Sequence, residues 1–327
     1  MSNSLKLIAV VCVTSLLFGC KKSDLKSLPI EVISIENGSY LRSVYFINDL
    51  VGYSCGGKRN EEGYIFKTTN GGISWNKTSP IKPKCIYDIH FINDSIGFAG
   101  GDSLYLLTTI DGGNNWNQYT YGYYELPFHK QNRPAIKDFS FNSNGTGYFV
   151  GGENYKKGVI YRTLDYGLTW DFDTLQQEIF STYATVNFSW SAGFGYIGKA
   201  ITGSGFTQQS LTEDVFTDIM ELDDNSVISI SNTGGIYKSR DNGSTWATIQ
   251  KKKGPFSKRV SYNAISFQGS RGVIIADYTI LLSEDYGDNW TEVDFISDDR
   301  LTAINSIAST YYISSEGGNL LKFEFLF

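Results

Sequence analysis

The sequence predicts an all-β chain that folds as a seven-bladed propeller of four-stranded blades. Three observations support this fold class. An eight-residue pattern, Ser/Thr-x-Asp-x-Gly-x-x-Trp, occurs five times, once with Asn in place of Asp, and its copies hold five of the six tryptophans. Between the copies, short apolar runs end at Gly, Asn or Asp, as strands do at their turns. Aromatic residues make up 15% of the 327 positions, which suits sheets better than helices.

The repeated pattern is expected to form a tight turn between the third and fourth strands of a blade. Gly at its fifth position supplies a positive φ, and the Asp or Asn and the hydroxyl before it can bond turn amides. The closing Trp can clamp the turn onto the sheet. The third positions are Asn70, Asp111, Asp165, Asp241 and Asp285, and the closing residues are Trp75, Trp116, Trp170, Trp246 and Trp290. A motif with the same local purpose in every repeat is architectural, so we expect these carboxylates to hold turns.

This turn is similar to the Asp-box of the bacterial neuraminidase (BNR) repeat, and the chain resembles the Asp-box β-propellers. The five copies share one register. The first copy departs from the pattern because Asn70 replaces Asp, which preserves a turn-stabilising side chain without the charge.

The N-terminus is predicted to be a lipoprotein signal peptide, residues 1–19. Lys6 precedes a short apolar run that ends at Leu17-Phe18-Gly19-Cys20, which resembles the lipobox of bacterial lipoproteins. Cys20 would then be the acylated first residue, residues 20–29 the lipidated Cys and its linker, and 30–327 the propeller. The alternative is an ordinary signal peptide or a short anchor, since Phe18 is bulkier than usual. We expect an exported chain, lipid-anchored to the bacterial cell envelope, at the outer membrane if the cell is Gram-negative.

Charge and cysteine content limit the partners of the chain. The formal net charge is −6 at pH 7, and loss of Lys6 with the leader makes it about −7, which argues against a nucleic-acid partner. Two cysteines remain in the folded part, Cys55 and Cys85. They could form a disulfide in an oxidising envelope, or they could be two small buried residues. Their spacing fits no metal site.

The first three blades are clear in the sequence. Blade one is predicted from strands at 42–46, 51–55 and 64–67, with a fourth strand after the repeated turn. Blade two repeats the phrase Ile-Asn-Asp-x-x-Gly at 92–97, as blade one has it at 47–52. Blade three is predicted from 136–141, 147–152 and 159–162.

The third positions of the turns are separated by 41, 54, 76 and 44 residues, and the interval of 76 is nearly two repeats. We expect blade four within it, with first and second strands at 186–190 and 195–198 and a third at 202–210 whose turn has lost the pattern. Blades five (213–250) and six (259–295) keep their turns. The last blade has only three runs, at 303–307, 311–314 and 320–327. The N-terminal run 30–35 is predicted to complete it and close the ring.

Ligand sites are expected on the face opposite the repeated turns, which lie with the first-to-second-strand turns on one face of the disc. The opposite face collects basic and aromatic residues in four loops, partly offset by glutamates. These residues could form a protein or glycan contact surface, or merely cover their own blades. The candidates are Lys58, Arg59, Tyr121, Tyr123, Tyr124, His129, Lys130, Arg133, Lys156, Lys157, Lys252, Lys253, Lys258 and Arg259.

Catalytic residues are not evident. A sialidase-like site needs an arginine cluster and an early Arg-Ile-Pro motif, but only eight arginines occur and the motif is missing. His90 and His129 cannot form a metal site alone, and no GxSxG or Cys-His arrangement is present. Asp88 and Asp138 share one place in the first strands of blades two and three, as polar channel residues or as parts of the repeat. We expect no enzyme activity, cofactor or metal.

The phrase Phe-Ile-Asn-Asp-x-x-Gly-Tyr/Phe, a following Gly-Gly and the repeated turn together resemble the photosystem II stability/assembly factor family and its relatives in non-photosynthetic bacteria. The resemblance is sharpest over residues 43–170. It implies a non-catalytic, seven-bladed scaffold that binds protein partners, through an Arg-rich patch in the photosynthetic members, and it does not imply photosynthesis.

Three functions are therefore considered. The first is a lipid-anchored envelope propeller that binds a protein or an assembly intermediate through the face opposite the turns. The second is a glycan-binding or sialidase-type glycoside hydrolase propeller, which would need a pair of carboxylates in a pocket. The third is a structural surface lipoprotein with no defined ligand.

Overall fold

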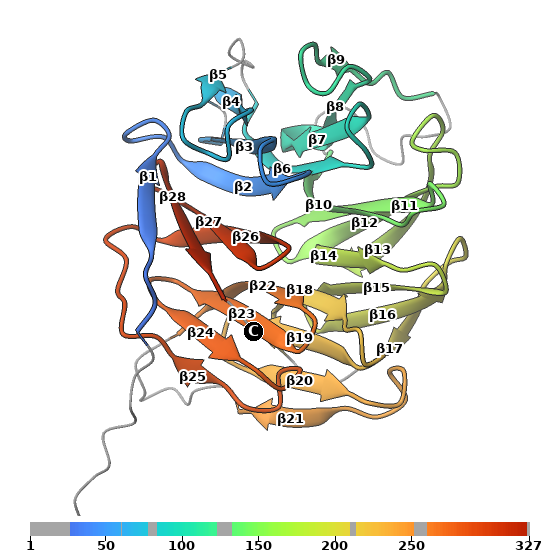
Figure 1. Cartoon of the computed structure of the whole chain (residues 1–327). Helices are drawn as coiled ribbons and strands as arrows, with labels where there is room; N and C mark the ends of the chain where they lie inside the picture. The colour runs from blue at the N-terminus through green and yellow to red at the C-terminus, as the bar shows by residue number, and fades with distance from the viewer. Residues whose placement is uncertain are drawn as a thin grey trace, which may run out of the picture.

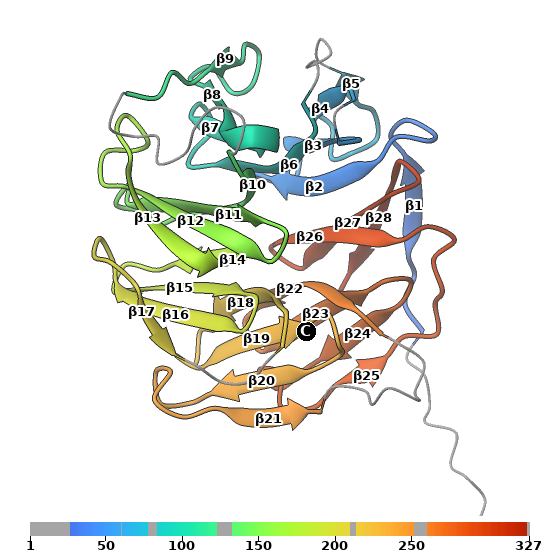
Figure 2. The same cartoon turned by 180° about the vertical axis from the view of Figure 1, so that it is seen from behind.

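The computed structural model describes residues 27–59, 61–77, 84–122, 133–209, 214–251 and 260–325. These residues form seven four-stranded antiparallel sheets that follow one another around a ring (Figure 1). Seen from behind, the same ring closes where the blue N-terminal strand meets the red C-terminal strands (Figure 2). The seven-bladed, all-β prediction is confirmed. Apart from one short 3-10 turn, η1 (Asp102–Leu104), the described residues contain no helix, and none of their elements is a helix able to cross a membrane.

The first six blades each take four consecutive strands. They consist of β2 (Leu41–Phe46), β3 (Gly52–Gly57), β4 (Gly63–Thr68) and β5 (Asn76–Lys77); β6 (Ile86–Phe91), β7 (Gly97–Gly101), β8 (Tyr105–Thr109) and β9 (Asn117–Gln118); β10 (Ala135–Phe141), β11 (Gly147–Glu153), β12 (Lys156–Thr163) and β13 (Asp171–Gln177); β14 (Ile179–Ala184), β15 (Phe188–Gly193), β16 (Tyr196–Ile201) and β17 (Thr207–Gln209); β18 (Phe216–Glu221), β19 (Val227–Ser231), β20 (Ile236–Ser239) and β21 (Ala247–Gln250); β22 (Tyr262–Gln268), β23 (Arg271–Ala276), β24 (Ile280–Ser283) and β25 (Thr291–Glu292).

The seventh blade joins the two ends of the chain. Strands β26 (Leu301–Ile307), β27 (Thr310–Ser315) and β28 (Asn319–Glu324) are completed by β1 (Glu31–Ser34), which pairs antiparallel with β28 from Glu31↔Lys322 to Ser34↔Asn319. The prediction that the N-terminal strand completes the last blade is confirmed. The main-chain hydrogen bonds between β1 and β28 therefore close the ring.

Blade four is shifted by one strand from the prediction. The run 186–190 overlaps the second strand and 195–198 the third, and 202–209 forms a turn and the fourth strand, while the first strand is Ile179–Ala184. Residue 210 lies outside the described residues. Only Glu178 separates this strand from β13, and no Gly, Pro, Asn or Asp lies there to mark the boundary. The missing turn signal explains why the sequence did not reveal this strand.

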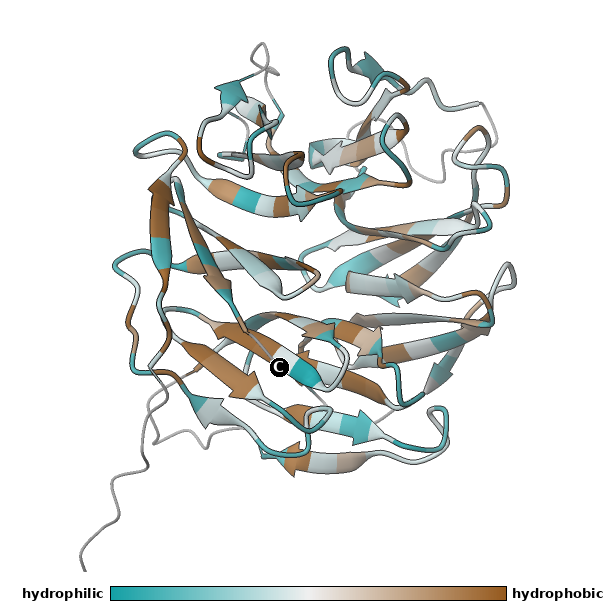
Figure 3. Cartoon of the chain, in the orientation of Figure 1, coloured by the Kyte–Doolittle hydropathy of each residue, from teal (hydrophilic) through white to brown (hydrophobic). Residues whose placement is uncertain are grey.

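The core lies between the blades, and apolar residues follow the strands whereas most connections are hydrophilic (Figure 3). In blades one, two and three, a Phe ends the first strand and a Gly begins the second, and in blade six the equivalent Phe267 and Gly272 lie one residue inside their strands. A side chain in place of that Gly would meet the Phe ring, as at Gly52, where a Cβ would lie 2.6 Å from Phe46. The Trp that closes the turn then packs edge-on against the same Phe, with ring planes 88° apart for Phe46 and Trp75. The Phe, the Gly and the Trp therefore pack together and hold the turn against the sheet.

The five repeated turns use one set of hydrogen bonds. In blade three the Thr163 hydroxyl donates to Asp165 Oδ1 at 2.7 Å and accepts from Gly167 N at 2.9 Å, and Asp165 Oδ1 also accepts from Thr169 N at 2.9 Å. The other four copies show the same three bonds, including the copy with Asn70. The oxygen of Asn70 thus replaces a carboxylate oxygen without loss of geometry.

Lysines from the preceding blade bind four of these turns. Lys238, which is 1% exposed, donates from Nζ to the Tyr286 carbonyl at 2.8 Å and to Asp288 Oδ1 at 2.8 Å. Equivalent bonds run from Lys67 to the Gly112 carbonyl, from Lys199 to the Asn242 carbonyl and from Lys322 to the Gly71 carbonyl. Part of the basic charge of the chain is therefore structural.

The two cysteines of the propeller do not form the disulfide that was considered. Both thiols are free and buried. Cys85 Sγ lies 3.1 Å from the Gly57 carbonyl, and Cys55 Sγ lies 3.9 Å from the Ile86 carbonyl. Each thiol therefore contacts a main-chain oxygen, and burial raises the pKa of the Cys85 thiol to about 11, which keeps it protonated.

Candidate functional site

The repeated turns and the first-to-second-strand turns lie on one face, which we call the turn face. Their main chains bond directly, for example from Gly71 N to the Leu50 carbonyl and from Gly112 N to the Ser95 carbonyl, both at 2.9 Å. The second-to-third-strand turns and the blade-to-blade connections therefore form the other side, which we call the opposite face.

Six of the fourteen predicted binding residues lie in the described part of the chain. Arg59 and Arg133 line one pocket on the opposite face. Lys58 lies 4.7 Å from the ring centre of Tyr40, and the Tyr121 hydroxyl donates to the Leu104 carbonyl at 3.0 Å. Lys156 and Lys157 are exposed on β12. The predicted residues Tyr123, Tyr124, His129, Lys130, Lys252, Lys253, Lys258 and Arg259, and the predicted lipidation site Cys20, lie outside the described residues.

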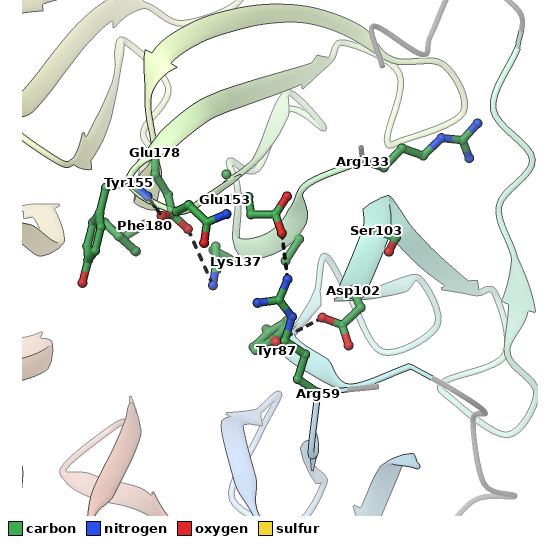
Figure 4. Close-up of a pocket in the computed structure, with 13 residues that line it drawn as sticks. Arg59, Tyr87, Asp102, Ser103, Arg133, Lys137, Glu153, Tyr155, Glu178 and Phe180 are labelled. Carbon is green, nitrogen blue, oxygen red and sulfur yellow. Dashed lines mark hydrogen bonds and ion pairs between the residues drawn. The ribbon is translucent and has the colours of Figure 1, made fainter. Parts of the chain in front are cut away.

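The pocket has a volume of about 470 Å³ and lies where blades one to four meet on the opposite face (Figure 4). Blade one contributes Arg59, and blades two, three and four contribute the rest. Its wall contains three basic, three acidic and three aromatic side chains. They are Arg59, Arg133, Lys137, Asp102, Glu153, Glu178, Tyr87, Tyr155 and Phe180.

Two ion pairs and a buried carboxylate set the charge of the pocket. Arg59 Nη2 donates to Glu153 Oε1 at 2.8 Å, which raises the pKa of the guanidinium, and Lys137 Nζ lies 3.8 Å from Glu178 Oε1. Asp102 is 6% exposed and accepts from the Tyr87 hydroxyl at 3.1 Å and from Cys85 N at 3.1 Å. Burial lowers the pKa of Lys137, although Glu178 opposes this shift.

The two turns that line the pocket hold residues in a conformation that favours glycine. Ser103 and Leu104 have φ of 62° and 54°, and Asn154, Tyr155 and Lys157 have φ of 57°, 60° and 53°. These are five of the ten non-glycine residues with positive φ in the described part. The other five lie in turns on the turn face, so this conformation shapes the turns at the pocket but does not by itself mark a binding site.

A second pocket of about 240 Å³ lies at the mouth of the central channel and adjoins the first. In every blade the first strand carries a bulge, and the residue that the pairing skips lines this mouth. The skipped residues are Arg42, Tyr87, Lys137, Phe180, Thr217, Asn263 and Thr302. Tyr87, Lys137 and Phe180 line both pockets, so the two form one groove from the channel mouth to blades two to four.

Within the channel, three aspartates join neighbouring blades. Asp88 Oδ2 accepts from Phe139 N at 3.0 Å, Asp138 Oδ2 from Thr182 N at 2.7 Å, and Asp218 Oδ2 from Ile265 N at 2.9 Å. Burial raises the pKa of Asp88 and of Asp218 to about 6 each. The pKa of Asp138 is raised well above its usual range by burial and by the charges of Asp88 and Asp218. Both interpretations of Asp88 and Asp138 therefore apply. The two side chains line the channel, and each makes the same repeated hydrogen bond to the following blade.

Sequence reasoning missed Lys137, Glu178, Tyr87 and Phe180, because it looked for site residues in loops. Three of these four are the skipped residues of first strands. A signal was present, since Tyr87 and Lys137 directly precede Asp88 and Asp138. Among the described residues, no group of three or more His, Cys, Asp or Glu side chains is placed to hold a metal ion.

Comparison with solved structures finds several propellers of the same fold. YCF48 bound to D1 peptide superposes with a TM-score of 0.71 at 18% identity, over 92% of this chain and 99% of that one. YCF48 from Cyanidioschyzon merolae gives 0.68 at 18% identity, over 90% and 98%. Both superpositions support the propeller fold of the chain.

Virginiamycin B lyase from Staphylococcus aureus is also similar, with a TM-score of 0.69 at 13% identity over 92% of this chain and 100% of the lyase. At these identities the likeness establishes the fold alone, and one fold here carries both a peptide-bound protein and an enzyme. No protein-family profile and no curated protein sequence matches the chain.

Proposed function

We propose that this chain is a non-catalytic propeller that binds a protein partner through the groove on the opposite face, as a scaffold for assembly in the cell envelope. The observation that carries this proposal is the groove itself. It extends from the channel mouth to the pocket, and its walls alternate cations, carboxylates and aromatic rings. Such a surface suits an extended segment of a protein partner, because Arg and aromatic side chains dominate binding energy at protein interfaces. The likeness to YCF48 bound to D1 peptide is consistent with this mode.

The carboxylates of the pocket support a binding role over a hydrolytic one. A glycoside hydrolase needs one carboxylic acid and one carboxylate facing a common substrate. Here Asp102 accepts two hydrogen bonds, Glu153 is paired with Arg59, and Glu178 accepts from Tyr155 N at 2.6 Å. Each is already held as an acceptor by a neighbour, which suits a fixed charge and not a proton donor.

The test is a pull-down from solubilised envelope with the lipidated protein, beside Arg59→Glu and its matched control Arg240→Glu. Both arginines are exposed and each forms one ion pair, but Arg59 lies at the groove and Arg240 in a turn on the turn face. We expect one protein to be enriched by the native form and the control and lost with Arg59→Glu. Equal enrichment by all three forms would contradict a partner site in the groove.

The membrane attachment is part of the same proposal and rests on the resemblance of residues 17–20 to a lipobox. We expect that cells fed an alkyne-labelled fatty acid will label the native chain and leave Cys20→Ser unlabelled. The same cells should show the native chain in the membrane fraction. Labelling of Cys20→Ser at the native level would remove the lipid anchor from the proposal while leaving the groove untouched.

A further inference from the structure

We propose that the pocket beside Lys137 binds a small zwitterion, a free amino acid or short peptide that presents an ammonium and a carboxylate together. This adds a small-molecule ligand to the groove, and it does not require the proposed protein partner. Four observations carry the inference: an ammonium with unused donors, a carboxylate oxygen with unused capacity, a second ion pair beside them, and a cavity of suitable size.

Lys137 is the first of these observations. Its Nζ lies 3.8 Å from Glu178 Oε1 and 4.7 Å from the centre of the Tyr87 ring. The first distance exceeds hydrogen-bond length, and no atom of the described residues accepts a hydrogen bond from this ammonium. The Lys137 side chain is 26% exposed and lines the pocket, so an oxygen of a ligand in the pocket would accept a hydrogen bond that no described residue accepts.

Glu178 is the second observation. It is 5% exposed, and its position is fixed because Oε2 accepts from Tyr155 N and because Gly152 packs against it. A Cβ at Gly152 would lie 2.5 Å from Glu178 Cγ and 2.8 Å from its Cα, so only glycine permits this approach. Among the described residues, the other oxygen, Oε1, has only the 3.8 Å ion-pair contact with Lys137 and can accept from a ligand ammonium. The two charges form an ion pair without a direct hydrogen bond, so each keeps hydrogen-bonding capacity for a ligand.

The neighbouring charges favour a ligand with both signs. Arg59 and Glu153 form a second ion pair beside the first, and Arg133 directs its guanidinium away from these four side chains (Figure 4). Asp102 is held by hydrogen bonds from Cys85 N and from the Tyr87 hydroxyl, one to each oxygen. A simple anion at Lys137 would face Glu178 and Glu153, and a simple cation would face Lys137 and Arg59. A zwitterion can place each end against the opposite charge and avoid both repulsions.

Size and walls complete the site. A cavity of about 470 Å³ falls within the range of small-molecule pockets and exceeds the volume of one amino acid. Phe180 and Tyr155, whose ring centres are 6.3 Å apart, form one side, and Tyr87 lies beneath Lys137. These rings offer an apolar surface to an aromatic side chain.

The experiment is titration calorimetry of the full propeller with three matched probes. Phenylalanine carries both charges, N-acetylphenylalanine only the carboxylate, and phenylalaninamide only the ammonium. We expect saturable binding of phenylalanine and at least about 10-fold weaker binding of each blocked compound, as loss of one charged hydrogen bond implies. No saturable binding of phenylalanine, or equal binding of a blocked compound, would overturn the proposal.

Two variants locate the site. Lys137→Met should weaken phenylalanine binding by about 10-fold or more, and Glu178→Gln should act similarly, whereas the control Arg240→Ala on the turn face should bind as the native chain does. Equal affinity in Lys137→Met, with an unchanged unfolding transition, would place any binding elsewhere and refute the site. A partner retained in the pull-down without phenylalanine binding would refute this inference alone, and the reverse would refute only the proposed protein binding.

Discussion

The two faces of the disc follow different rules. On the turn face, five blades use the same hydroxyl, carboxylate or amide, glycine and tryptophan, and a lysine from the preceding blade binds four of these turns. On the opposite face, the turns that line the groove differ from blade to blade. The hydroxyl, the carboxylate or amide and the glycine of each repeated turn bind one another, although Nε1 of Trp116 and of Trp246 is buried without an acceptor among the described residues. The groove instead holds an ammonium and a carboxylate oxygen that no direct hydrogen bond joins. Regularity thus identifies what holds the fold, and departure from it identifies what is available for binding.

The largest effect should come from a glycine of the turn face. Gly167 has φ of 82°, and a Cβ there would lie 2.4 Å from the Phe98 ring of the preceding blade. Gly167→Ala should therefore lower the free energy of unfolding by about 3 kcal/mol, through overpacking and an unfavourable φ. Urea unfolding followed by tryptophan fluorescence measures this.

The matched control lies in the one turn of the ring that has lost the pattern. Gly203 in blade four has φ of 87°, but a Cβ there would meet only Leu164, at 3.3 Å. Gly203→Ala should cost about 1 kcal/mol, the strain of the backbone alone. Equal losses in the two variants would show that packing against the preceding blade adds nothing to the stability of the repeated turn.

The next effect compares two lysines. Lys238 is buried and binds the turn of the following blade, and Lys238→Met leaves the Tyr286 carbonyl without that donor, so we expect a loss of about 2 kcal/mol. Lys58 is exposed on the opposite face, and Lys58→Met should change stability by less than about 0.5 kcal/mol. Thermal or urea unfolding measures both, and a comparable loss at Lys58 would contradict the division of basic residues between the faces.

A third comparison uses pH and sets a channel carboxylate against a turn carboxylate. Burial raises the pKa of Asp218 to about 6, above its unfolded value near 4, so the folded state binds more protons between these values. Stability from this group should fall as pH rises from about 4 to 6, and Asp218→Asn should remove that fall. Hydrogen bonds from Asn115 lower the pKa of Asp111 to about 2, so its stabilisation is lost as pH falls.

The measurement is the urea midpoint of the native chain, Asp218→Asn and Asp111→Asn between pH 3 and 7. Relative to the native chain, Asp218→Asn should gain stability with rising pH, by an amount of order 2 kcal/mol, and Asp111→Asn should lose it. Slopes of the same sign would mean that the two carboxylates do not differ in environment as their contacts indicate.

The sequence predicted the features that recur from blade to blade and missed those that belong to one blade or to the groove. Seven blades and the N-terminal closure follow from the spacing of the turns and the leftover run at 30–35, because each depends on a local pattern. The first strand of blade four was missed because no turn residue separates it from β13. The groove was missed in part because Lys137 and Phe180 line it as the skipped residues of bulges in first strands. These bulges are seen only in the pairing of first with second strands.

The smallest effect on stability should accompany the clearest effect on binding. Arg59 and Arg240 each form one exposed ion pair, of 2.8 Å with Glu153 and of 2.6 Å with Asp288. Exposed pairs contribute little, so Arg59→Ala and Arg240→Ala should each change the free energy of unfolding by less than about 1 kcal/mol. Only Arg59→Ala opens the ion pair beside Lys137, so only this variant should change phenylalanine affinity and retention of the partner. If both variants bound phenylalanine and the partner as the native chain does, the charged residues of the groove would have a structural role only.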